Sequence, residues 1–516
     1  MSREELAGSK LGVTLVVMTA ALMAMIDITI VNVALNDIRA SFGTPIDQIG
    51  WVSTGYMMAN IVIIPMTGWF QRRFGYKRYF AASVAIFTLA SALCSLAWNL
   101  PSLVVFRALQ GLGGGAIIPT AQSILFARYP KQEHGMAAAL FGLGAISGPL
   151  LGPTLGGYLI DWSSWHWIFT INIPIGLAVA LLALRFIEQP GFVPPKGEDA
   201  RVDIFGIALL AVGMACLQYV LEEGNREGWF ESRVILALAI VAGVTLITFI
   251  LHELETPQPI VDLRVFLGRN YAAGTALNFL TGFALFGGSF LFSLYAGSVL
   301  RYSALDIGKI FLAAGTISVI MMPLIGRLGP KLDGRILLAI GLAIVAYSQF
   351  TASELTAAAG YWDAVRPNFL RSLGLAFVFI PVSVVALSNL APEQRGNATG
   401  LFNLTRELGG SLGTALMGML VSDGVKIHGS YLSEAITPYN PLVQSQLGQL
   451  AGGVGAQTFQ SQLVGESLLA AKVNTQALVL SFENGFRWVA FTVACALLLV
   501  LLLEKPKNAG AVAGAH

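Results

Sequence analysis

The residues from Gly144 to Gly157 read GAISGPLLGPTLGG, and glycine recurs there at every fourth position. On a helix this spacing places residues without side chains along one stripe, which a neighbouring helix can approach closely. Pro149 and Pro153 remove backbone donors beside the stripe, so we expect the helix to bend. Apolar flanks make the segment long enough to span a bilayer. The glycines of this motif are Gly144, Gly148, Gly152, Gly156 and the adjacent Gly157.

The composition is that of a membrane protein rather than a soluble one. Of 516 residues, 55% are hydrophobic and only 12% are charged, against about 25% charged in soluble domains. The net charge of +2 gives no strong field for nucleic acid. Three cysteines far apart and five scattered histidines favour neither a disulfide framework nor a metal site. No P-loop is present, and the GxSxG match from Gly409 to Gly413 lies inside an apolar run. We therefore expect no enzyme, no cofactor and no metal.

Apolar runs long enough to cross a membrane recur along the whole chain. Basic residues gather in the loops after even-numbered runs, so the positive-inside rule places both termini in the cytoplasm. The first run is too long for a cleaved signal and is interpreted as a retained span. The fourteen predicted spans are about 11–35, 48–70, 79–98, 102–126, 136–160, 166–187, 203–221, 233–251, 271–299, 306–326, 335–352, 366–389, 397–421 and 486–504.

Three sequence matches indicate an internal repeat. Pro65-x-x-Gly68 recurs as Pro323-x-x-Gly326 at an offset of 258, and the residues around Arg107 echo those around Arg371 at 264. The glycine stripe itself returns 261 residues later, at Gly409 and Gly413. Parallel repeats of this kind build two-bundle transporters. We predict an all-α membrane protein with a six-helix bundle at 1–190, a linker with two extra helices at 191–270, and a second bundle at 271–516 that includes an outer loop at 422–485.

Four of the charged residues that fall within predicted spans are candidates for proton coupling. A charged side chain in a span costs roughly 2.5 to 3.5 kcal/mol, so it should face a polar cavity or a partner. Asp27 and Glu407 are the acids, and both are candidate proton sites. Asp27 could instead hydrogen-bond to Asn32 or Thr29 for packing alone. Arg107 could reach the membrane surface, and Arg406 could form a structural pair.

Several motifs together resemble those of one transporter family. The first span contains IDITIVNVAL (26–35), the fourth contains FRALQG (106–111), the fifth contains the glycine–proline stripe, and Thr405-Arg406 begins a further match. GWFQRRFGYKR (68–78) resembles the loop between the second and third helices, although Arg72 stands where that loop normally has an acid. The chain is similar over nearly its whole length to the fourteen-helix drug/proton antiporters of the major facilitator superfamily, of the EmrB type. The matching residues of the cytoplasmic loop motif are Gly68, Arg72, Arg73, Gly75, Lys77 and Arg78.

The resemblance implies the major facilitator fold with 14 transmembrane helices and a glycine-striped helix at the interface between the two halves. It also implies proton-driven export of hydrophobic or amphipathic drugs across a bacterial inner membrane, with an EmrA-like periplasmic adaptor and an outer-membrane channel as partners. An uptake symporter and a non-transporting sensor or scaffold are the alternatives. The resemblance implies proton coupling through Asp27, Arg107, Arg406 and Glu407, and the candidate cavity residues are Asn32, Gln110, Phe279 and Phe283.

Overall fold

A computed structural model describes residues 10–45, 48–188, 203–257, 259–328, 332–387, 390–434, 436, 439, 441–452 and 459–504. The predicted boundary at 190/191 lies outside these residues. The principal helices are α2 (Lys10–Phe42), α3 (Trp51–Phe74), α4 (Tyr76–Ser95), α5 (Leu100–Arg128), α6 (His134–Trp162), α7 (Trp167–Thr170), α8 (Asn172–Phe186), α9 (Ile204–Glu223), α10 (Arg233–Glu255), α11 (Arg269–Gly282), α12 (Gly288–Ser298), α13 (Ala304–Leu328), α14 (Gly334–Ala352), α15 (Tyr361–Leu387), α16 (Pro392–Glu434), α17 (Pro441–Gly452) and α18 (Phe459–Val500).

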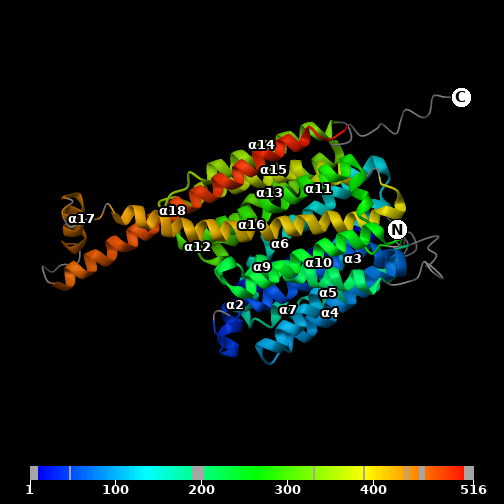
Figure 1. The fold of residues 1–516 in the computed structure, drawn as a ribbon, viewed down its shortest axis with the longest axis horizontal. Coiled ribbons are helices and arrows are strands. Elements are labelled where there is room, and N and C mark those ends of the chain that lie inside the picture. The colour runs from blue at the N-terminus through cyan, green and yellow to red at the C-terminus, as the bar shows by residue number, and fades with distance from the viewer. Residues whose placement is uncertain are drawn as a thin grey trace.

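The long helices run roughly side by side in one elongated bundle (Figure 1). Among the described residues, eleven helical segments are long and apolar enough to cross a membrane. The helices α3, α6 and α16 run among these eleven, and polar residues lower the apolar content of α3 and α16. The total of fourteen spans stays a prediction. The predicted ninth span corresponds to α11 and α12, which are joined by a π-helical turn at Phe283–Gly287.

Contacts between the first and second halves follow the predicted repeat. An added Cβ at Gly135 of α6 would lie 2.6 Å from the carbonyl oxygen of Gly326 in α13. Gly68 of α3 is packed in the same way against the backbone of Asn397 in α16. Because Gly68 matches Gly326 and Gly135 matches Gly396 in the repeat, the two contacts are related by exchange of the halves. The halves therefore meet through two equivalent helix pairs, α6–α13 and α3–α16.

The glycine stripe packs against a different partner from the one predicted. Gly144, Gly148, Gly152 and Gly156 all face α2, which belongs to the same half. The expectation that the stripe itself faces the opposite half is therefore wrong. The α6 helix does lie between the halves, but it meets α13 with its other face, where Gly142 touches Met322. The spacing of glycines identifies a close-packing face but carries no information about which helix fills it. The side chains of Pro149 and Pro153 lie outside the described residues.

The second half repeats this arrangement. An added Cβ at Gly409 of α16 would meet the backbone of Phe279 in α11, and one at Gly413 would lie 2.8 Å from the carbonyl oxygen of Phe283. A register correction also follows. Gly113 of α5 packs on Phe87 of α4, and Gly374 of α15 packs on Val345 of α14. The offset between α5 and α15 is therefore 261 rather than 264, so the predicted match between Arg107 and Arg371 is wrong by almost one helical turn.

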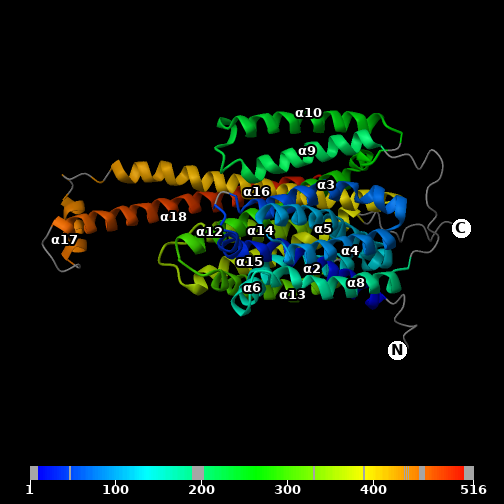
Figure 2. The same cartoon turned by 90° about the horizontal axis from the view of Figure 1, so that it is seen from below.

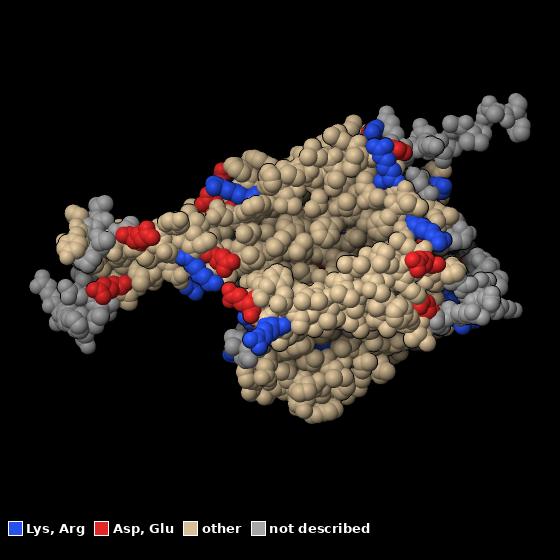
Figure 3. Space-filling model, in the orientation of Figure 1, with Lys and Arg blue, Asp and Glu red and all other residues tan. Residues whose placement is uncertain are grey.

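The two extra helices lie on one side of the bundle (Figure 2). α9 contacts both halves, because Thr54 of α3 donates to Glu223 at 3.1 Å and Gln218 of α9 donates to Ser411 of α16 at 3.1 Å. α10 packs mainly on α9 and exposes an apolar face. Figure 3 shows charged side chains at both ends of the molecule and a broad uncharged band between them. That band is the surface expected for a multi-pass membrane protein.

Among the described residues, the predicted outer loop at 422–485 is largely helical. α16 continues to Glu434, α17 covers Pro441–Gly452 and α18 begins at Phe459. At about 1.5 Å per residue, helices of 43 and 42 residues are about twice as long as the bilayer core requires. They project together beyond the bundle as an arm, which α17 caps (Figure 1). Ser481 packs against Gly424 near the base of this arm.

Candidate functional site

A buried polar cluster surrounds Asp27 in the middle of α2. The Asp27 side chain is fully inaccessible, and its Oδ2 accepts a hydrogen bond from Nη1 of Arg107 at 2.6 Å. Oδ1 accepts from Nε2 of Gln110 and from Nδ2 of Asn172, both at 2.8 Å. Gln110 also donates to the hydroxyl of Ser91 at 2.7 Å. The cluster therefore brings together side chains from α2, α4, α5 and α8, and it satisfies both carboxylate oxygens.

Arg107 connects the cluster to α3. Its Nε donates to the carbonyl of Val52 at 3.2 Å, and its guanidinium lies 4.2 Å from the ring centroid of Tyr56. Because Arg107 is only 1% exposed, it does not extend to the membrane surface, and the snorkelling alternative is wrong. Hydrogen bonds from Arg107 to the carbonyl of Val52 and to Oε1 of Gln110 help to offset the cost of burying the ion pair.

The alternative in which Asp27 hydrogen-bonds to Asn32 or Thr29 for packing alone is also wrong. The hydroxyl of Thr29 donates to the carbonyl of Gly148 at 2.8 Å, across the glycine seam. Asn32 is exposed, and its Oδ1 accepts from Ser53 at 3.2 Å. Neither residue contacts the carboxylate. The Asp27 carboxyl group is instead held by one cation and two amides.

Arg406 and Glu407 form a second charged group, on α16. Arg406 is 1% exposed, and its Nη2 lies 3.6 Å from Oε1 of Glu407. Within the described residues, Nη1 and Nη2 of Arg406 make no hydrogen bond. The rings of Phe141 in α6 and Phe379 in α15 lie 5.8 and 5.6 Å from this guanidinium. Arg406 thus points toward the place where the two halves meet. One helical turn away, Asn403 donates to Gln122 of α5 at 2.6 Å, directly across the interface.

The cytoplasmic loop motif forms the end of α3 and the turn into α4. Gly75 adopts a positive φ of 79°, which explains the need for glycine there. Gly68 packs on Asn397, and Arg72 donates to the carbonyl of Pro259 at 3.2 Å, so both touch segments that follow the first half. Three further basic residues complete the turn, and their side chains are half-buried or exposed: Arg73, Lys77 and Arg78.

The predicted cavity residues do not come together in this conformation. Gln110 belongs to the Asp27 cluster, whereas Asn32 is exposed elsewhere on α2. Phe283 is 5% exposed and packs on Gly413, and Phe279 is half-buried against Gly409. Phe283 therefore does not face the lipid.

Sequence reasoning missed Asn172 and Ser91. Asn172 is an amide within the apolar run 166–187, and a polar side chain in such a run is itself a signal for a buried partner. Ser91 carried no comparable signal, because a serine satisfies its own helix and here donates to the carbonyl of Phe87 at 2.9 Å.

We expect Asn172→Ala to destabilise the protein by about 1–3 kcal/mol, because it removes one donor from a buried carboxylate. Asn32→Ala is the matched control, since that amide is exposed and lies on the helix that carries Asp27. Thermal unfolding of the purified protein in detergent measures both. An equal change in Tm for the two variants would contradict the assignment of Asn172 to the cluster.

Apolar helices arranged in two matched halves, with charges buried between and within them, define a polytopic membrane carrier. Residues 17–414 match the family model of the Major Facilitator Superfamily. The chain belongs to the major facilitator superfamily and is a transporter, not an enzyme.

Similar proteins cover nearly its full length. It is 33% identical over 500 residues to "Multidrug export protein EmrB" of Haemophilus influenzae, with 97% of this chain and 96% of that protein covered. It is 34% identical over 513 residues to the Escherichia coli (strain K12) protein of the same name, with 98% of each covered. Among solved structures, the human organic anion transporter MFSD10 has the same fold, with a TM-score of 0.56, 12% identity, and coverage of 94% of this chain and 99% of that one.

Proposed function

We propose that this protein is a proton-driven antiporter that exports hydrophobic or amphipathic drugs by alternating access. We place it in the bacterial inner membrane with both termini in the cytoplasm. The observation that carries the proposal is the buried acid Asp27, which is paired with Arg107 inside the transporter bundle. The names of the relatives, which are multidrug export proteins, support the choice of cargo.

The contacts of Arg107 suggest how a proton could change the conformation. A charged Asp27 holds Arg107, which also touches the backbone of Val52 and the ring of Tyr56 in α3. Further along, α3 packs against α16 of the other half through Gly68. Protonation of Asp27 removes the charge that holds Arg107. The arginine then reorients, and α3 transmits the change to the interface between the halves.

We assign a second role to Arg406 and Glu407, which lie where substrate would separate the halves. The guanidinium of Arg406 has hydrogen-bonding groups without a partner among the described residues, and two phenylalanine rings flank it. Glu407 supplies a second acid that can take up a proton when the pair separates. Phe279 and Phe283 remain predicted substrate contacts that require α11 and α16 to move apart first.

One proton supplies enough free energy to drive export against a drug gradient. A charge that crosses a potential of 100 mV supplies about 2.3 kcal/mol. At tenfold per 1.4 kcal/mol, this supports a drug gradient of roughly fiftyfold.

The direction of transport distinguishes the proposal from an uptake symporter. Cells that lack the protein should accumulate more ethidium than cells that produce it. Equal or lower accumulation would count against export. Proteoliposomes with an imposed pH gradient separate a carrier from a sensor or scaffold, because only a carrier moves drug when the gradient is applied and stops when it is collapsed.

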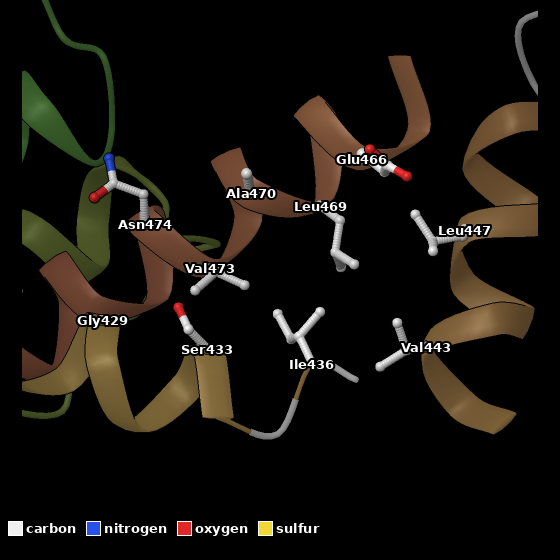
Figure 4. Close-up of a pocket in the computed structure, with 10 residues that line it drawn as sticks. All are labelled: Gly429, Ser433, Ile436, Val443, Leu447, Glu466, Leu469, Ala470, Val473 and Asn474. Atoms are coloured by element: carbon white, nitrogen blue, oxygen red, sulfur yellow. The ribbon is translucent and has the colours of Figure 1, made fainter. Parts of the chain in front are cut away.

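We further propose that the arm contacts an EmrA-like periplasmic adaptor, which leads to an outer-membrane channel. The described residues of α16, α17 and α18 line a pocket of about 550 Å³ in the arm. Ile436, Val443, Leu447, Leu469 and Val473 give this pocket an apolar lining (Figure 4). An apolar surface held far from the bilayer is available to a protein partner.

Replacing residues 433–474 by a short Gly/Ser linker should weaken drug resistance in cells but leave transport in liposomes unchanged. The base of the hairpin is retained in this variant, because Gly424 and Ser481 still meet. Resistance tests and liposome flux measured on the same variant provide the check. If liposome flux is also lost, the arm is part of the carrier's own structure rather than a docking element.

A further inference from the structure

A small pocket in the second half contains a buried cation without a counter-charge. Arg371 of α15 is 6% exposed, and its recorded partner is the ring of Phe311, whose centroid lies 5.7 Å away. Among the described residues, no carboxylate lies within ion-pair distance of Arg371 and no side chain hydrogen-bonds to it. Leaving a buried charge without a partner is strongly destabilising. Something outside the described protein atoms should therefore balance this arginine.

The pocket is the counterpart of the Asp27 cluster. In the register set by Gly113 and Gly374, Gln110 corresponds to Arg371, and the packing of α4 and α14 makes Ser91 correspond to Gln349. The same helices of the repeat line both sites, namely the first, third, fourth and sixth of each half. The first half supplies a carboxylate from α2. The helix in its place, α12, presents Gly288 instead, which has no side chain.

Two donors converge where that carboxylate is missing. An added Cβ at Gly288 would lie 2.6 Å from Nε2 of Gln349 and 3.1 Å from Nη1 of Arg371. Gln349 is 2% exposed, and its Nε2 is buried without a hydrogen-bond partner. A guanidinium and an amide N–H₂ with no acceptor form a site for an anion. Ser348 and Asn368 add further polar atoms to the lining.

The size of the pocket selects the kind of anion. Its volume is about 10 Å³, which is close to what one water-sized particle needs. A drug, a phosphate or a carboxylic acid with an organic tail is too large. A single-atom anion fits after small movements of the Gln349 and Arg371 side chains. A water molecule would fit as well, but it would leave the charge of Arg371 unbalanced.

We propose that Arg371 and Gln349 bind a halide ion, with chloride as the physiological occupant. The site differs in kind from the Asp27 cluster, because a carboxylate can be protonated whereas a bound chloride stays an anion. The second half then keeps a fixed, neutralised arginine at the position that corresponds to the Asp27 cluster. The halide site does not rest on the proposed drug export, since neither a drug nor a proton gradient enters the argument.

The test is the chloride dependence of thermal unfolding of the purified full-length protein. Sodium chloride is titrated into sodium gluconate at constant ionic strength, so that only the identity of the anion changes. We expect the Tm of the wild-type protein to rise by about 2 °C or more per tenfold increase in chloride, with bromide acting similarly. A Tm that is the same in chloride and gluconate would overturn the proposal.

Three variants locate the effect. Arg371→Gln should abolish the chloride dependence, whereas Arg366→Gln, on the exposed side of the same helix, should retain it. Gly288→Asp supplies a built-in carboxylate, so it should unfold independently of chloride even if Arg371→Gln does not fold. Persistence of the full chloride effect in Gly288→Asp or in Arg371→Gln would refute the site. Anomalous scattering from bromide in crystals of the wild-type protein should give a peak beside Arg371, and an empty pocket would refute it as well.

Discussion

Asp27→Asn should reduce drug transport driven by a pH gradient to background. The variant keeps the shape of the side chain and most of its hydrogen bonds, but it can no longer take up or release a proton. It also leaves Arg107 without its buried counter-charge, and breaking such a pair typically costs about 3–5 kcal/mol. Loss of transport alone would therefore not separate coupling from folding, and the experiment needs two further measurements.

The first measurement is drug counterflow in liposomes without a gradient. Exchange of labelled for unlabelled drug needs the moving carrier but no net proton transfer, so Asp27→Asn should retain it. The second uses the double variant Asp27→Asn/Arg107→Gln, in which neither residue carries a charge. Its Tm should recover toward the wild-type value, while transport driven by the gradient should stay absent.

Asp37→Asn is the matched control, because Asp37 lies on the same helix and is exposed. It should leave both flux and Tm unchanged. Gradient-driven transport that survives in Asp27→Asn would remove Asp27 from the coupling mechanism. In that case Glu407, the second acid assigned to proton coupling, becomes the candidate to test by the same design.

The periodicity of the sequence encodes some features of the fold but not others. Length and hydropathy predicted a helical membrane protein, because the bilayer requires long apolar segments of any helical chain that spans it. The repeat offsets predicted its two halves. The importance of Asp27 and Arg107 followed from the cost of burying charge. The family resemblance implied that both take part in proton coupling, but no spacing rule indicated that they pair, since 80 residues separate them in the sequence.

Other features depend on which helix faces which, and a single sequence does not contain that information. The partner of the glycine stripe is one example. The contribution of α8 to the cluster is another, because Asn172 and Asp27 are 145 positions apart in the sequence. The empty position at Gly288 is a third. That Gly288 stands where the first half has a carboxylate can be recognised only once the register of the repeat is known.

Gly148→Leu should abolish transport and lower Tm by more than any other change within the glycine stripe. An added Cβ would lie 2.6 Å from the carbonyl oxygen of Met25 and 2.8 Å from its Cβ. Separations below 3.0 Å are essentially never seen for real Cβ atoms, so α2 and α6 must move apart. Extra methylenes in a well-packed core usually cost about 1–3 kcal/mol. The cost should exceed this here, because the obstacle is backbone rather than a flexible side chain.

Gly157→Leu is the matched control for Gly148→Leu. Gly157 belongs to the same motif and the same helix, but an added Cβ there meets no atom within 4 Å. Replacing a helical glycine also removes a cost of about 1 kcal/mol relative to alanine, so this variant should be as stable as the wild type or slightly more so. Thermal unfolding and gradient-driven flux measured on both variants compare a glycine required by packing with one that is not. If Gly157→Leu is as damaging as Gly148→Leu, the stripe matters through the flexibility of its backbone rather than through the close contact with α2. The bending expected of α6 would then explain the motif better than the seam.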